Sequence, residues 1–185
     1  SVSERLRRVL ERVAREVKRL IDEDRKVNEE AEREVRKLIK KDEDALKRVA
    51  EEVERLIREA SDDDKLIREI EEILKKLAED SRKVVEESKK VLDDINKESE
   101  DVVKESEDTL RRAAEELKEV ERRGESEEII EELIRRLEEI VKRLEEKHRT
   151  TVKKIEDIIR ELKKTHDKTI EDLRRIIEEI EERVR

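Results

Sequence analysis

Two histidines and two aspartates are the residues of this sequence with the widest chemical range. His148 and His166 lie 18 residues apart, and the same interval separates Asp24 from Asp42. Serines and threonines recur at related positions. A carboxylate, an imidazole and a hydroxyl are the groups of a nucleophilic triad, and the first two also bind metal ions. Acyl transfer, metal binding and a structural hydrogen-bond network are therefore the three chemistries to weigh.

An 18-residue repeat of apolar residues indicates which elements carry these side chains. Examples are Val17, Val35 and Val53 in the first third of the chain and Leu137, Ile155 and Leu173 in the last. An α-helix completes about five turns in 18 residues, so such residues return to the same face. A heptad repeat would force the helices into a left-handed supercoil, whereas this repeat does not. We therefore predict long and nearly straight helices.

Two short interruptions set the number of helices. The first is Ser61 followed by Asp62, Asp63 and Asp64, whose side chains can cap the start of a helix. The second lies at Gly124, which can close one helix, and Ser126, which can cap the next. Ser1 and Glu4 fit a capping box. The helices are expected at about 2–60, 63–122 and 126–184. Short loops make neighbouring helices antiparallel, so we predict an all-α, up-down-up three-helix bundle that forms one domain over residues 1–185.

Polar residues replace apolar ones at a few positions of the repeat. His148 and His166 follow Ile130, and Asp24 and Asp42 follow Leu6, in steps of 18. In an antiparallel bundle the polar positions fall into two buried layers about 27 Å apart. The first layer contains Asp24, Asn28, Asn96, Ser99, Ser106, His148 and Thr151, and the second contains Asp42, Ser81, Ser88, His166 and Thr169.

The three chemistries differ in how well the remaining residues support them. A triad also needs a substrate cleft and an oxyanion hole, which nothing in the sequence supplies. Each layer offers one histidine and one aspartate, fewer than the three or four ligands that zinc usually takes. We therefore expect no catalytic residue, no cofactor and no metal site. A hydrogen-bond network remains, because a carboxylate and a hydroxyl can occupy both imidazole nitrogens.

Such layers would act on specificity. An unpaired buried polar group costs about 1–3 kcal/mol. A helix that slides by one repeat, or that pairs with another chain, would leave these groups unpaired. We therefore predict that the layers fix the register of the helices.

Composition narrows the function further. Of the 185 residues, 58% are charged and 32% hydrophobic, and the sequence has no aromatic residue, cysteine or proline. The net charge of −9 argues against nucleic acid as a partner. We expect neither a membrane span nor a targeting segment. Without cysteine the chain can have no disulfide framework.

With its repeat and polar layers, the sequence resembles computationally designed helical bundles that are built on parametric backbones and contain buried hydrogen-bond networks. The resemblance covers the whole chain and implies a very stable scaffold without enzymatic activity. It also implies that the protein has no natural location. We expect it in the cytoplasm of the host that expresses it. We expect a soluble monomer that requires no partner. The alternative is an interaction module that accepts a further, designed partner helix or self-associates as a homo-oligomer.

The buried histidines also suggest a response to pH, whose sign the sequence leaves open. A histidine held as a cation by its aspartate has a raised pKa, and its contribution to stability fades as the pH rises through that pKa. A histidine buried in its neutral form has a lowered pKa, and acid then destabilises the fold.

Overall fold

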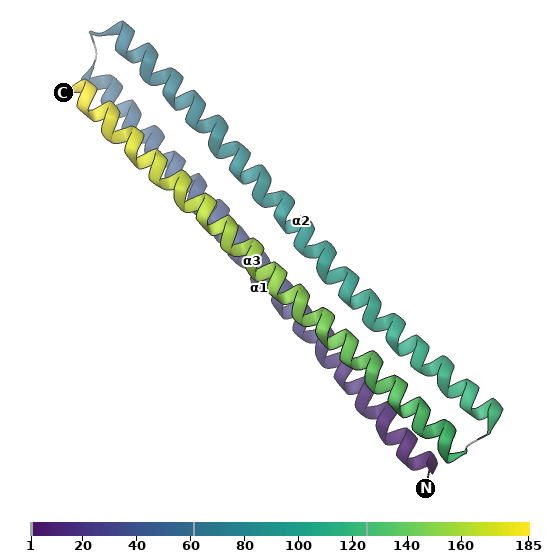
Figure 1. Cartoon of the computed structure of the whole chain (residues 1–185). Coiled ribbons are helices and arrows are strands. Elements are labelled where there is room, and N and C mark those ends of the chain that lie inside the picture. Colours follow the sequence, from purple (N-terminus) through teal and green to yellow (C-terminus); the bar gives the residue numbers. More distant parts are fainter. Residues whose placement is uncertain (1, 61, 125) are drawn as a thin grey trace. The chain divides into compact units, whose positions relative to one another are not determined.

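The computed structural model describes residues 2–60, 62–124 and 126–185, which form three long α-helices (Figure 1). They are α1 (Val2–Glu59), α2 (Asp64–Arg123) and α3 (Glu127–Val184). The predicted all-α three-helix architecture is confirmed, and each predicted helix boundary lies within one residue of the observed one. Within the described part of the chain no helix has a segment that is both long and apolar enough to cross a membrane.

The helix ends follow the predicted capping chemistry where the structure describes them. The carboxylate of Asp63 accepts a hydrogen bond from the backbone N–H of Leu66 (3.1 Å), which caps the start of α2. The hydroxyl of Ser126 accepts a longer bond from the N–H of Ile129 (3.4 Å). Gly124 adopts a positive φ of 97°, the left-handed conformation that glycine tolerates best after a helix. Ser1, the predicted cap of α1, lies outside the described residues.

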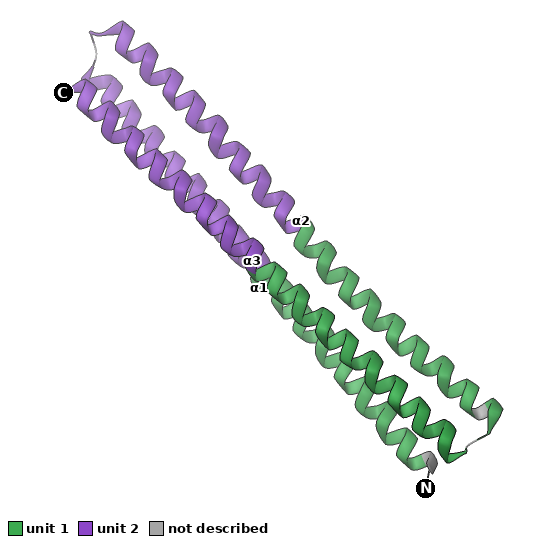
Figure 2. Cartoon of the chain, viewed as in Figure 1, with its two compact units in different colours: residues 1–30, 94–156 green, residues 31–93, 157–185 purple. Residues whose placement is uncertain are grey.

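The helices run through two compact units (Figure 2). Unit 1 comprises residues 1–30 and 94–156, and unit 2 comprises residues 31–93 and 157–185. Each unit contains a segment of all three helices and a core of its own. In unit 1 the core is built around Val17, Val120 and Leu137, and in unit 2 around Val53 and Ile70.

Contacts within each unit set the direction of the helices. In unit 1, Arg5 lies near Glu131 and Arg12 near Glu138, so α1 and α3 run parallel. Between α2 and α3, Glu98 pairs with Lys154 and Glu116 pairs with Arg136. Residue numbers therefore rise along α2 as they fall along α3, so these two helices are antiparallel. The up-down-up order predicted from the short loops is therefore present.

The 18-residue repeat faces the core. Val17, Val35 and Val53 on α1 are each fully buried. Branched apolar side chains at this spacing form a continuous stripe on one face of a helix, and the charged residues occupy the other face. The predicted straightness of the helices over their full length stays a prediction.

Candidate functional site

Each unit holds one histidine–carboxylate cluster, and residues of different helices form each of them. We call these the Asp24 cluster, with Glu23, Asp24 and His148, and the Asp42 cluster, with Asp42, Ser81, Ser88 and His166. The Asp24 cluster lies in unit 1 and the Asp42 cluster in unit 2.

In the Asp24 cluster a histidine lies between two carboxylates. The Nδ1 atom of His148 lies 2.5 Å from Oδ1 of Asp24, and its Nε2 atom lies 3.2 Å from a carboxylate oxygen of Glu23. Asp24 is 3% exposed, whereas Glu23 is 44% exposed in its side chain. The cluster therefore joins α1 to α3, and its Glu23 side borders on solvent.

One side of the Asp24 cluster is unsatisfied. Oδ2 of Asp24 and Oδ1 of Asn28, one helical turn later, are both buried without a hydrogen-bond partner among the described residues. Burial raises the pKa of Asp24, and the nearby His148 opposes this shift by its charge and its hydrogen bond. The unpaired oxygen agrees with a raised pKa, because hydrogen bonds to a carboxylate favour its charged form and Oδ2 accepts none among the described residues.

In the Asp42 cluster the polar groups are fully enclosed and join all three helices. Ser81 on α2 donates a hydrogen bond of 2.5 Å to Oδ2 of Asp42 on α1. The hydroxyl of Ser88, also on α2, lies 2.8 Å from Nε2 of His166 on α3. Asp42, Ser88 and His166 have no exposed surface, so bulk solvent does not reach them.

The hydrogen bonds of Ser88 assign the tautomer of His166. The Ser88 hydroxyl donates its single proton to the backbone carbonyl of Val84 (2.8 Å). It must therefore accept from His166, which places a proton on Nε2. The other ring nitrogen, Nδ1, faces Oδ1 of Asp42 at 3.8 Å, and neither atom has a hydrogen-bond partner in the described part of the chain. That separation is too long for a hydrogen bond.

The surroundings of His166 favour its neutral form. Burial lowers the pKa of His166, and the charges of Asp42 and Asp167 oppose this only in part. A neutral imidazole with its proton on Nε2 presents a lone pair on Nδ1 to the Asp42 carboxylate. Two acceptors repel each other, which accounts for the long distance between them.

Several predicted members of the layers lie outside the hydrogen-bonded clusters. Ser106 is buried, but it donates to the carbonyl of Val102 on its own helix (2.8 Å). Thr169 is only half-buried and donates to the carbonyl of Thr165 (2.9 Å). Ser99 and Thr151 are buried, yet within the described ranges neither is hydrogen-bonded to the Asp24–His148 pair. Hydroxyls in helices readily bond the carbonyl four residues earlier, and that competes with bonds across the bundle.

The prediction that Asn96 is buried is wrong, because its side chain is exposed. The repeat aligns Asn96 with Ala78 and Ala114, so its predicted burial depends on two alanines. In the structure Ala78 is half-buried and Ala114 is exposed. Alanine is tolerated at both boundary and core positions of a helix, so it does not identify the buried face.

Two polar residues were not predicted, one in the Asp24 cluster and one buried in unit 1 outside that cluster. Glu23 contacts His148 but lies at a position whose repeats are the charged residues Arg5 and Lys41, so nothing in the pattern marks it. Thr109 is buried and donates to the carbonyl of Glu105. It follows Ile73 and Val91 in steps of 18, so the apolar repeat could have identified it.

The geometry limits what the clusters can do chemically. Ser88, His166 and Asp42 occur in the order of a nucleophilic triad, but the Ser88 proton points to Val84 and the histidine nitrogen facing Ser88 already carries a proton. His148 presents its two nitrogens to two different carboxylates on opposite edges of the ring, so these groups do not converge on one ion. Over the described residues no group of three or more acidic or histidine side chains is arranged to hold a metal.

Comparison with known protein families, curated protein sequences and solved structures finds no match to this chain.

Proposed function

We propose that the chain is a designed structural scaffold whose two polar clusters determine which helix faces pair and in which register. The observation that carries this proposal is that, among the described residues, every hydrogen bond of the Asp42 carboxylate or the His166 ring is made with another helix. In the Asp24 cluster the bond between Asp24 and His148 likewise joins two helices. No natural activity is part of the proposal.

A helix paired in a shifted register would be destabilised, because the repeat would then place apolar residues opposite the buried polar ones. If α3 moved by one repeat against α1, Asp42 would face the position of Val184, and His148 would face Leu6. Removing the partner of a buried charged group costs about 3–5 kcal/mol. The apolar stripe alone would tolerate such a shift, since its residues recur every 18 positions. The polar clusters therefore add the discrimination that the apolar core lacks.

The loops restrict such shifts within one chain, so the clusters act mainly against pairing between chains. We propose that the chain is monomeric for this reason and requires no partner. Light scattering coupled to size exclusion should give a mass near 22.3 kDa.

A cross-linking experiment in unit 1 tests the role in register. The guanidinium of Arg12 and the carboxylate of Glu138 lie 3.0 Å apart, so a flexible cross-linker between the cysteines of an Arg12→Cys, Glu138→Cys chain reports the observed register. An Arg12→Cys, Glu156→Cys chain reports a shift by one repeat. Each pair is treated with a flexible bismaleimide cross-linker in the parent chain and in a chain carrying Asp24→Leu, Asp42→Leu, His148→Ile and His166→Ile. Those four substitutions place in both clusters the residues that the repeat already holds at Leu6 and Ile130.

In the parent chain we expect only the observed-register pair to be cross-linked, and we expect the link within monomers. In the chain without the two clusters, the shifted pair should also be cross-linked, as a link between two chains. If the chain without the two clusters still forms only the observed-register link and stays monomeric, the clusters do not determine pairing and the proposal is wrong.

A further inference from the structure

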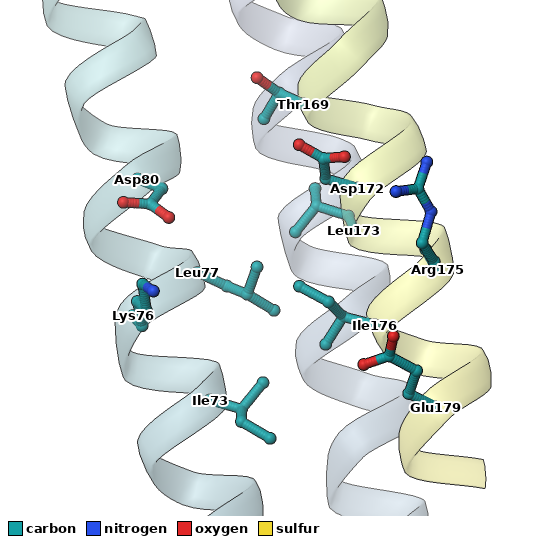
Figure 3. Close-up of a pocket in the computed structure, with 10 residues that line it drawn as sticks. All are labelled: Ile73, Lys76, Leu77, Asp80, Thr169, Asp172, Leu173, Arg175, Ile176 and Glu179. Carbon is teal, nitrogen blue, oxygen red and sulfur yellow. The ribbon is translucent and has the colours of Figure 1, made fainter. Parts of the chain in front are cut away.

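A groove with an apolar floor lies between α2 and α3 in unit 2 (Figure 3). Its volume is about 450 Å³. Ile73 and Leu77 extend into it from α2, and Leu173 and Ile176 extend into it from α3. Ile73 and Ile176 are only half-buried by the chain itself. The groove could therefore bury further apolar surface.

The charges at the edge of this groove break a pattern that the rest of the α2–α3 contact obeys. Glu116 on α2 pairs with Arg136 on α3, and Glu98 pairs with Lys154. One further step of 18 residues leads from Glu98 to Asp80 on α2. The same step leads from Lys154 to Asp172 on α3. At this third position both helices therefore carry an acidic residue. At the other two positions an acidic residue of α2 pairs with a basic residue of α3.

The acidic side chains of α3 are directed to the groove. Asp172 and Glu179 lean toward the space between α2 and α3, whereas Arg175 lies over the other side of α3 (Figure 3). Among the described residues, none of the five charged side chains that line the groove forms an ion pair: Lys76, Asp80, Asp172, Arg175 and Glu179. Three carboxylates and two cations therefore line the groove, and within the described part of the chain none of them is in an ion pair.

We propose that this groove is the docking site of a basic amphipathic helix from another protein. Such a helix would place its leucine-type side chains on the floor formed by Leu77, Leu173 and Ile176. A lysine or arginine next to this apolar stripe would lie between Asp80 and Asp172, in the place that a basic residue of α3 occupies in the other two repeats. Apolar anchors one turn apart, flanked by charges, are the usual way in which a groove recognises a helix.

Charge identifies the partner as basic and argues against a second copy of this chain. The net charge of the chain is −9, and like charges facing each other across an interface oppose association. A second copy has the same excess of acidic over basic residues, 58 against 49, which makes it a poor match for an edge with acidic residues at both Asp80 and Asp172. A basic helix would instead neutralise this position.

The probe for the experiment is an 18-residue peptide composed only of leucine and lysine, with the leucines spaced at three and four residues. A peptide with glutamate in place of lysine is its counterpart. The variant Asp172→Lys restores the basic residue that the repeat has at Arg136 and Lys154, so it should pair with Asp80 and fold normally. Glu171→Lys is the matched control, because Glu171 is exposed, adjacent in sequence and not part of the groove.

Methyl NMR spectra of the whole chain report where and how tightly each peptide binds. We expect the leucine–lysine peptide to shift the methyl signals of Ile73, Leu77 and Ile176, and Asp172→Lys to weaken this binding about tenfold. Glu171→Lys should weaken it by less than about twofold, and the glutamate peptide should not bind. Equal weakening by both variants, shifts away from the groove, or no binding would overturn the proposal. Shifts at these methyl groups that depend on protein concentration alone would also overturn it, because a second copy would then occupy the groove.

Discussion

The carboxylate of Asp42 depends on one serine for its hydrogen bonding. Its Oδ2 atom accepts from Ser81, and its Oδ1 atom has no hydrogen-bond partner within the described parts of the chain. Both residues are buried, so water cannot replace a lost hydroxyl at low cost. Among the serines of the two units, Ser81 should therefore be the one whose hydroxyl matters most for stability.

We predict that Ser81→Ala lowers the free energy of unfolding by about 1–3 kcal/mol, because it leaves a buried acceptor without its donor. Ser106→Ala is the matched control, since Ser106 is equally buried but donates only to the Val102 carbonyl of its own helix. Its loss should be below about 1 kcal/mol, because hydroxyls bonded in this way support a helix little. Urea denaturation measures both. Equal losses in the two variants would show that the Asp42–Ser81 bond contributes no special stability.

At the scale of the elements, the starts of the helices depend on individual side chains. α2 begins at the last of three consecutive aspartates, and only the middle one, Asp63, accepts a hydrogen bond from the first turn among the described residues. The composition of this loop indicated capping, but it did not show which of the three acids would serve.

We expect Asp63→Ala to destabilise the fold by about 1 kcal/mol, the usual effect of removing an N-cap side chain. Asp62→Ala changes the same charge one residue earlier, in the exposed loop, and should change the free energy of unfolding by less than about 0.5 kcal/mol. Thermal unfolding of the two variants, followed by circular dichroism, distinguishes them. If Asp62→Ala proved the more harmful, the hydrogen bond to Leu66 would not be the cap that stabilises α2.

The elements were predictable from the sequence because each depends on local rules. The repeat that contains Val17, Val35 and Val53 specifies the buried face of α1, and the break at Gly124 specifies the end of α2. These features follow from helix periodicity and from the conformational freedom of glycine. The same periodicity also predicted that Asp24 lies at the same height along the helices as His148, and Asp42 at the same height as His166.

The details of the site were less predictable because they depend on competition between partners. The sequence showed hydroxyls near the imidazoles, but it did not show that Ser106 and Thr169 would bond their own helices. It also did not separate the buried Ser99 from the exposed Asn96, since a rotation of a few tens of degrees around the helix decides between core and surface. Such choices depend on side-chain geometry rather than on spacing.

At the scale of the whole molecule, the two units contain clusters with opposite responses to acid. Burial raises the pKa of Asp24 in unit 1 above its usual 3.8 and lowers the pKa of His166 in unit 2 below its usual 6.5. A raised carboxyl pKa means that the folded state binds a proton more readily than the unfolded state, so acid favours folding. A lowered histidine pKa has the reverse effect. A single unfolding midpoint for the whole chain would mix the two contributions.

We therefore predict that unit 2 loses stability as the pH falls from 7.5 to 5.5. The contribution of His166 is fully present above pH 6.5 and is lost as the pH falls through the lowered pKa of the folded state, because the unfolded chain then takes up a proton that the buried ring resists. The groups that face or adjoin this ring are Asp42, Asp167 and Ser88, and the two acids only partly offset the effect of burial.

Native-state hydrogen exchange resolves the two units, once each rate is corrected for the intrinsic effect of pH. Protection of Val53 in unit 2 should fall over this range, and His166→Gln should abolish most of the fall because glutamine does not titrate. Val17 in unit 1 is the internal reference, since Asp24 contributes with the opposite sign. If protection of Val53 rose on acidification, a proton would have entered between Nδ1 of His166 and Oδ1 of Asp42. The cluster would then be held together as an ion pair, not as a neutral imidazole beside a carboxylate.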